Sequence, residues 1–202
     1  MIKVYHAGRS RSLRVVWMAE EMGLPYEVAA VDFRAPRPPE FLALNPANTL
    51  PVMVDGPVVL TESLAILQYL GDRHGPTDLV VRPDEPGYPE YLQFLMLGEA
   101  GLAAPMNAVI GTRFFGPEDQ EDNWTVGMVI EGFARRLKLV ERRLEDGRRF
   151  LAADRFTAAD ISVGYTIGLA EALELHDKIP DAVRFYRERL VARPAFQRAA
   201  AA

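Results

Sequence analysis

The sequence predicts a mixed α/β domain followed by an all-α domain. Two observations support this division. Short β-rich runs alternate with helical periodicity in the first third of the chain, and only helical periodicity follows a proline-rich connector. We expect residues 1–75 to form the first domain, residues 76–87 a linker and residues 88–202 the helical domain. A chain of 202 residues is long enough to bury a core without disulfides.

The first third begins with a β-α-β unit. Residues 2–5 and 26–31 are strand-like, and residues 10–22 between them carry apolar side chains at helical spacing. Gly23 and Pro25 are typical of the end of a helix. Two strands joined by one helix predict parallel neighbours with a right-handed crossover.

The stretch from Asn45 to Leu70 predicts a hairpin followed by a helix. Leu50-Pro51 opens a strand over residues 52–54, where a proline cannot donate a ladder hydrogen bond. The turn signal Asp-Gly-Pro comes next, and residues 58–60 read as the returning strand. Because Leu50 precedes a strand-initiating proline, its N–H and C=O have no sheet partner. They are available to pair with a bound peptide.

Two interpretations apply to the polar start of the helix that follows. Thr61 and Glu62 are typical of helix capping, since the threonine can accept a hydrogen bond and the acid favours the positive end of the helix dipole. The same N-terminus, at Glu62-Ser63, can instead receive a carboxylate on its free N–H groups while Glu62 holds an ammonium. This second arrangement would bind the head group of an α-amino acid.

The helical domain is predicted from several apolar-periodic segments. The most regular covers residues 123–144, where apolar residues keep a three-four spacing. Residues 88–111 form another, kinked near Pro105. Thr157 to Asp160 is a capping-box pattern, with aspartate in place of glutamate, before a helix over residues 161–173.

Composition argues against several function classes. The net charge is −5 and the basic residues are scattered, so we expect no nucleic-acid partner. The chain has no cysteine and only three, widely separated histidines, so we expect neither disulfides nor a metal. No signal peptide is recognisable, and no uncharged apolar run approaches the roughly 18 residues of a membrane span. We therefore expect a cytoplasmic protein with no membrane partner.

These motifs resemble the soluble, cytosolic-type glutathione S-transferases, and the resemblance extends over the whole chain. Leu50-Pro51-Val52 is similar to the cis-proline site of the family's N-terminal domain, and Glu62 to Leu70 to its Glu-Ser-x-Ala-Ile-x-x-Tyr-Leu helix start. The helical half, with its capping box, is similar to the family's C-terminal domain. The resemblance implies an α/β thioredoxin-like domain followed by an all-helical domain, the glutathione transferase fold.

The resemblance also implies a site for glutathione as co-substrate. The γ-glutamyl head group would be held by Glu62 and Ser63. The cysteinyl backbone would pair with Leu50, which precedes the cis Pro51.

The expected site departs from the family pattern at the glycyl end of glutathione. Many relatives place a lysine near the glycyl carboxylate, where this chain has Thr49. Three alternatives follow. Asn48 and Thr49 bind the carboxylate without charge, Arg34 or Arg37 from the preceding loop supplies the charge, or the tripeptide binds more weakly.

The resemblance places the catalytic group just after the first strand, in a Ser-Arg-Ser-x-Arg-Val pattern seen in bacterial and fungal members. Ser10 is the first choice and Ser12 the reserve, which implies a bacterial, serine-type active site; Tyr5 lies within the strand and is a poorer donor. Both serines are also typical of helix N-caps. Arg11 either adds positive potential or is a solvated surface arginine, and His6 is expected to pack beside the strand.

The electrophile is expected between the domains, against the C-terminal helices. Methionine and aromatic residues at helical spacing are also typical of a core. The candidate lining residues are Met106, Ile110, Phe114, Phe115 and Trp124.

The expected activity is attack of the glutathione thiolate on a small, hydrophobic electrophile, as in detoxification. The alternatives are a glutathione-dependent peroxidase or disulfide reductase, an isomerase, or a non-catalytic binding module of the same fold. The resemblance implies a homodimer.

Overall fold

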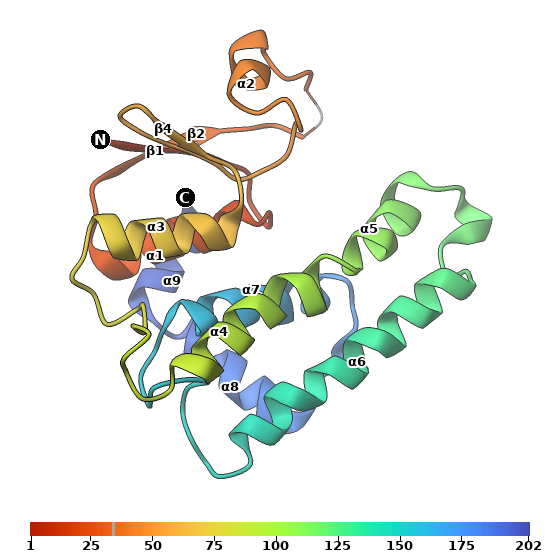
Figure 1. Cartoon of the computed structure of the whole chain (residues 1–202). Coiled ribbons are helices and arrows are strands. Elements are labelled where there is room, and N and C mark those ends of the chain that lie inside the picture. The colour runs from red at the N-terminus through yellow and green to blue at the C-terminus, as the bar shows by residue number, and fades with distance from the viewer. Residues whose placement is uncertain (34) are drawn as a thin grey trace. The chain divides into compact units, whose positions relative to one another are not determined.

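A computed structural model describes residues 1–33 and 35–202 of the chain (Figure 1). Contacts group the chain into two compact units, Met1–Val80 together with Val191–Ala202, and Val81–Leu190. We call them the α/β unit and the helical unit. The end of the chain, which sequence analysis assigned to the helical domain, thus groups with the α/β unit.

The α/β unit contains a four-stranded mixed sheet. Its strands are β1 (Ile2–His6), β2 (Tyr26–Ala30), β3 (Val52–Asp55) and β4 (Val58–Leu60), in the order β2-β1-β3-β4. Strands β1 and β2 are parallel, which confirms the crossover predicted for the β-α-β unit. The β1–β3 and β3–β4 pairs are antiparallel, and the second is the predicted hairpin.

Helices cover both faces of this sheet. Helices α1 (Ser12–Met22) and α3 (Ser63–Arg73) lie together on one face, and α2 (Pro39–Leu44) lies on the other (Figure 1). Helix α2 packs through Phe41, whose ring meets that of Tyr5 with centroids 5.3 Å apart. Fully buried residues of sheet and helices form the core, among them Val4, Met53, Val15, Val16, Ile66 and Leu67.

The last helix, α9 (Pro194–Ala201), is tied to α1 by charge and by an aromatic contact. The guanidinium of Arg193 donates two hydrogen bonds to the carboxylate of Glu21, at 2.6 and 2.7 Å. The rings of Trp17 and Phe196 meet edge to face, with centroids 4.8 Å apart. A bidentate arginine–carboxylate pair fixes orientation as well as distance, so these contacts explain why the chain end groups with the α/β unit.

The helical unit consists of helices and short helical turns. They are α4 (Tyr88–Met96), the π-helical η1 (Leu97–Ala103), α5 (Met106–Phe115), η2 (Glu118–Gln120), α6 (Trp124–Leu144), α7 (Ala158–Ala172), η3 (His176–Lys178) and α8 (Asp181–Val191). The break expected near Pro105 is a π-helical segment that ends at Ala103, after which Pro105 stands at the N-cap of α5.

Close packing against α7 holds this π-helical segment. A Cβ atom added at Gly98 would lie 2.3 Å from the Oγ of Ser162, so only glycine allows the approach. The Ser162 hydroxyl donates to the carbonyl of Leu95 at 2.8 Å, and the Thr166 hydroxyl donates to that of Gly98 at 2.7 Å. Two buried hydroxyls therefore satisfy carbonyls where the regular α-helical pattern is interrupted.

The continuous helical run Tyr88–Phe115 is long and apolar enough to cross a membrane by length and composition alone, with a mean hydropathy of 1.3. Sequence analysis expected no membrane span because no uncharged run of sufficient length occurs. The core helix of a soluble protein meets the same length and composition criteria, and Tyr91, Leu95 and Leu102 of this run are buried in the fold.

The predicted capping box at the start of α7 is present, and its acid is fully buried. The Asp160 carboxylate accepts hydrogen bonds from the N–H groups of Leu151 and Thr157, at 3.0 and 2.8 Å, and from the hydroxyl of Tyr186 at 2.8 Å. Burial nevertheless outweighs these bonds and raises the pKa of Asp160 to about 6. The folded protein therefore holds this proton more tightly than the unfolded chain does.

This raised pKa predicts a pH-dependent contribution to stability. Between pH 4 and pH 6 the unfolded carboxyl loses its proton before the folded one, so the free energy of unfolding falls as the pH rises, by about 3 kcal/mol in total. Asp160→Asn cannot titrate and lacks this term. Urea unfolding of both proteins from pH 4 to pH 7 should show the wild-type advantage shrinking; an advantage that grows with pH would contradict the assignment.

Candidate functional site

The strand pairing brings three separate loops to one edge of the sheet. Tyr5 of β1 lies opposite Val52 of β3, so the loop that leaves β1 and the segment that enters β3 are neighbours. Strand β4 pairs antiparallel with β3 and places Leu60 opposite Met53. The start of α3, which follows β4, therefore lies at the same edge. Most of the residues predicted from the sequence for glutathione binding and catalysis are found in these three loops.

In the loop after β1, the two candidate serines occupy different environments. Ser12, at the start of α1, is fully buried, and its Oγ lies 2.7 Å from the Nδ1 of His6. Ser10 is partly exposed, and its Oγ lies 2.5 Å from that of Ser12. Ser10 Oγ also accepts a hydrogen bond from the N–H of Ser12 at 3.2 Å. Ser10 thus makes a contact of the helix-capping kind at the start of α1. Only Ser10 has access to solvent.

His6 lies at the inner end of this chain of side chains. It is 4% exposed, and burial lowers the pKa of its imidazole. Sequence analysis expected His6 to pack beside the strand and assigned it no polar contact with Ser12. The sequence signal for this contact was a histidine at the end of the first strand, six residues before Ser12.

The segment that enters β3 has the geometry that the resemblance implies. The Leu50–Pro51 peptide bond is cis. Within the described residues, the backbone N–H and C=O of Leu50 have no hydrogen-bond partner. Before them, the buried amide of Asn45 donates to the carbonyl of Thr49 at 2.8 Å, which fixes the loop while Asn48 and Thr49 remain exposed. Sequence analysis gave Asn45 no role.

At the start of α3, Glu62 is exposed and Ser63 is buried. Glu62 is the N-cap residue, but its side chain makes no capping hydrogen bond in the described structure. The Ser63 hydroxyl accepts a hydrogen bond from the guanidinium of Arg14, at 3.2 Å. Arg14 is fully buried, so it places a positive charge beside the positive end of the α3 dipole. This edge favours an anion.

Sequence analysis did not identify Arg14 as part of the site. The residue is the arginine of the Ser-Arg-Ser-x-Arg-Val pattern, whose spacing places it one turn into α1. That pattern was the signal that could have found it.

The two arginines considered for the glycyl carboxylate have different outcomes. Arg34 lies outside the described residues. The guanidinium of Arg37 donates to the carbonyls of Asp32 and Ala35 in its own loop and lies 5.4 Å from the ring centroid of Phe33. Arg11, next to Ser10, is half-buried at the N-cap position of α1.

The five residues predicted to line an electrophile site lie in the helical unit. Met106 is fully buried at the start of α5, and Ile110 is half-buried one turn later. Phe114, Phe115 and Trp124 are 64%, 84% and 79% exposed. The end of α5 and the start of α6 thus present three large aromatic side chains to solvent.

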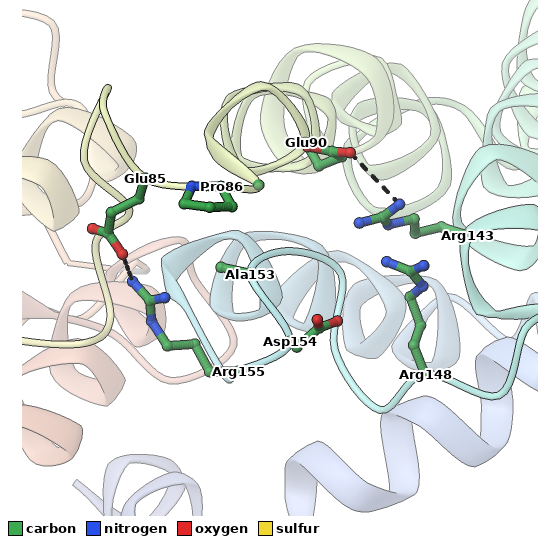
Figure 2. A pocket seen from close by; sticks show the side chains of 9 residues that line it. Glu85, Pro86, Glu90, Arg143, Arg148, Ala153, Asp154 and Arg155 are labelled. Carbon is green, nitrogen blue, oxygen red and sulfur yellow. Dashed lines mark hydrogen bonds and ion pairs between the residues drawn. The ribbon is translucent and has the colours of Figure 1, made fainter.

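A separate cleft of about 460 Å³ lies within the helical unit (Figure 2). Arg155 pairs with Glu85 at 2.7 Å on one side of the cleft. On the other side, Arg143 lies 3.8 Å from Glu90. Positive and negative groups balance within this lining, and none of the residues predicted from the sequence belongs to it. Its charged lining residues are Glu85, Glu90, Arg143, Arg148, Asp154 and Arg155.

Among the residues that the structure describes, no group of three or more His, Cys, Asp or Glu side chains could hold a metal ion. The groups that the described structure brings to this edge of the sheet include hydroxyls, backbone amides, the His6 imidazole, the Glu62 carboxylate and the buried Arg14 guanidinium.

Comparison with known proteins gives consistent matches over both units. The family model for the glutathione S-transferase N-terminal domain matches residues 9–73, and that for the C-terminal domain matches residues 101–198. Glutathione S-transferase 3 of Schizosaccharomyces pombe is 38% identical over 105 residues, which are 50% of this chain and 43% of that protein.

Longer matches support the same assignment. Glutathione S-transferase 1 of the same yeast is 32% identical over 166 residues, covering 78% of this chain and 70% of that protein. The solved structure of a glutathione transferase family member from Pseudomonas fluorescens, with two glutathione bound, has a TM-score of 0.84 and 29% identity, and the match covers 98% of this chain and 92% of that one. The chain belongs to the glutathione S-transferase family.

Proposed function

We propose that this protein is a bacterial, serine-type glutathione transferase that binds glutathione at the described edge of the sheet. The observation that carries the proposal is the buried Arg14 guanidinium, which donates to Ser63 at the start of α3 and lies four residues after Ser10. The short segment from Ser10 into the first turn of α1 thus links the start of α3, which favours an anion, to an accessible hydroxyl. The glutathione bound to the Pseudomonas fluorescens relative supports the choice of ligand.

The start of α3 binds the γ-glutamyl head group. The α-carboxylate of this head group accepts hydrogen bonds from the N–H groups of the first turn of α3 and from the Ser63 hydroxyl. The dipole of α3 and Arg14 stabilise negative charge there. The exposed carboxylate of Glu62 binds the α-ammonium. Since Glu62 makes no capping bond, its side chain is available for this contact.

The cysteinyl and glycyl parts lie along the segment that enters β3. Leu50, which precedes Pro51 across a cis peptide bond, offers to the cysteinyl residue its backbone N–H and C=O, which have no partner among the described residues. The glycyl carboxylate binds to Asn48 and Thr49, which are exposed and uncharged. Arg37 already donates hydrogen bonds to carbonyls of its own loop. We therefore favour the alternative in which Asn48 and Thr49 bind the glycyl carboxylate without charge.

Ser10 activates the thiol. A thiol with a pKa near 8.5 is only a few per cent thiolate at neutral pH, and the thiolate is the nucleophile. The Ser10 hydroxyl donates a hydrogen bond to sulfur, while the N-terminus of α1 and Arg11 add positive potential; a fall of about two pKa units corresponds to roughly 2.7 kcal/mol. The thiol proton passes to solvent and the thiolate attacks an electrophilic carbon. A carbon–sulfur bond forms as the bond from that carbon to its leaving group breaks, and the leaving group departs with the electron pair.

The electrophile is a small, hydrophobic molecule. The aromatic residues Phe114, Phe115 and Trp124 at the end of α5 and the start of α6, with half-buried Ile110, supply apolar contacts for it, whereas Met106 is fully buried and supports α5 from within the core. The protein acts in the cytoplasm, in detoxification. Four test substrates separate the possible activities: turnover of an aryl halide indicates a transferase, of a peroxide a peroxidase, of a disulfide a reductase and of a cis-enone an isomerase. Glutathione binding without turnover of any of them indicates a binding module.

Ser10→Ala should raise the pKa of the bound glutathione thiol by about one to two units, because the charge-assisted hydrogen bond to sulfur is lost. Ultraviolet difference absorbance of the thiolate, followed against pH for the wild type and the variant, measures this. The glutathione Kd at about pH 5.5, where the thiol is protonated in both complexes, should change little and serves as the control. If the thiol pKa of bound glutathione equals that of free glutathione in both the wild type and the variant, the proposed role of Ser10 is wrong.

Glu62→Ala should weaken glutathione binding about fivefold, because an exposed ion pair contributes up to about 1 kcal/mol. Isothermal titration calorimetry at low and high salt measures the change, which should shrink at high salt. Asp72→Asn, which removes an exposed carboxylate from the other end of α3, is the matched control and should bind as the wild type does. Equal affinity of Glu62→Ala and the control would rule out an ammonium contact.

We also propose that the protein is a homodimer. Size-exclusion chromatography with light scattering should give about twice the 22.5 kDa chain mass. A single 22.5 kDa species at micromolar concentration would contradict this.

A further inference from the structure

Three side chains form a continuous line of hydrogen bonds from the end of β1 to the surface of the loop. Ser12 Oγ lies 2.7 Å from His6 Nδ1 and 2.5 Å from Ser10 Oγ. His6 and Ser12 are buried, whereas Ser10 is partly exposed. A buried imidazole is thus connected to the accessible hydroxyl through one intermediate group.

Two backbone groups also donate to this line. The N–H of Ala7 donates to Ser12 Oγ at 3.3 Å, and the N–H of Ser12 donates to Ser10 Oγ at 3.2 Å. A serine hydroxyl has one proton and can accept two hydrogen bonds. Each serine oxygen therefore has one proton and one acceptor position left for the side-chain line. The carbonyl of Ala7, 3.4 Å from Ser12 Oγ, is a longer alternative for the Ser12 proton.

The position of the imidazole proton decides the direction of donation. If Nδ1 of His6 carries no proton, Ser12 donates to it and Ser10 donates to Ser12. Ser10 then presents only a lone pair to a ligand, which favours a neutral thiol over a thiolate. If Nδ1 carries the proton, His6 donates to Ser12 and Ser12 donates to Ser10. Both acceptor positions of Ser10 are then filled, and only its O–H is left for the ligand.

We propose that His6 is a positioning residue that carries its proton on Nδ1 and, through Ser12, makes Ser10 a hydrogen-bond donor toward the sulfur of bound glutathione. The inference rests on the proposed function, because it concerns the same hydroxyl and the same thiol. It gives His6 and Ser12 a part in thiol activation although neither contacts the sulfur.

The surroundings of His6 fit this role. Burial lowers the pKa of the ring, so at neutral pH the imidazole is neutral and only one of its two nitrogens carries a proton. The backbone carbonyl of His6 accepts the N–H of Val31 at 2.7 Å, and the residue pairs with Ala30 in the parallel register. The strand therefore fixes the backbone of His6, and the ring reaches Ser12 Oγ from it.

Nitrogen-15 NMR of imidazole-labelled protein saturated with glutathione tests the proton position directly. The chain has three histidines, and the His6 signals are identified by their loss in His6→Asn. The expected spectrum shows a protonated Nδ1 and an unprotonated Nε2 for His6. A complex in which the proton is on Nε2 would overturn the inference.

Two variants test the consequence for the thiol. His6→Leu removes the donor, and the pKa of the bound thiol should rise by up to about one unit, from about 6.5 to about 7.5, which lowers the thiolate fraction at pH 7 about threefold. His6→Asn offers an amide N–H close to the position of Nδ1, and should bring the thiol pKa back toward the wild-type value. The glutathione Kd at about pH 5.5, where the thiol is protonated in every complex, should stay the same in both variants, since His6 does not contact the ligand.

The outcomes separate this inference from the proposed function. If wild-type protein does not bind glutathione, the proposed function fails. If glutathione binds and Ser10→Ala raises its thiol pKa while His6→Leu leaves it unchanged, only the role of His6 fails. If His6→Leu does not fold, as judged by circular dichroism, the NMR measurement on the wild type decides.

Discussion

The antiparallel pairing of β1 with β3 is the constraint on which the arrangement of the proposed site depends. Because Tyr5 lies opposite Val52, the loop that carries Ser10 leaves the sheet where the cis Leu50–Pro51 segment enters it. The β3–β4 hairpin then returns the chain to the same edge, where α3 begins. A slip of one residue in this register would turn every side chain of the strand to the opposite face. Loops tens of residues apart in sequence are thus brought together by one pairing.

Buried polar groups stabilise the conformation of these loops. Hydrogen bonds join Arg14 to Ser63, His6 to Ser12, and Asn45 to the carbonyl of Thr49. A buried polar group that lacks a partner is costly, so each of these contacts makes one loop conformation much more favourable than the alternatives. Ser10, which is partly exposed, and Glu62, which is exposed, lie on the outside of the same loops, where we propose that they contact glutathione. A preorganised binding site requires both features: buried side chains that fix the loops, and accessible side chains on the same loops that can contact a ligand.

Local patterns made much of the fold predictable. Helical spacing, turn signals and the capping box identified the β-α-β unit, the hairpin, α6 and the start of α7, because each depends on residues close together in the chain. The grouping of α9 with the α/β unit was not predictable in this way. It depends on an ion pair between Arg193 and Glu21, which are 172 residues apart.

The motifs in the sequence suggested positions for the candidate site but not their contacts. Ser10, Ser12, Leu50 and Ser63 came from these motifs as candidates, and the motifs could not tell the partly exposed Ser10 from the buried Ser12, because that difference arises from tertiary packing. The partner of Ser63 is 49 residues away, so its contact was likewise outside any local pattern.

The central claim is that glutathione binds along this edge with its sulfur at Ser10. A crystal structure of the protein with glutathione tests it most directly. The account predicts the sulfur within hydrogen-bond distance of Ser10 Oγ, the cysteinyl backbone paired with Leu50 and the γ-glutamyl carboxylate at Ser63. Glutathione bound elsewhere, such as in the charged cleft of the helical unit, or a sulfur directed away from Ser10, would contradict it.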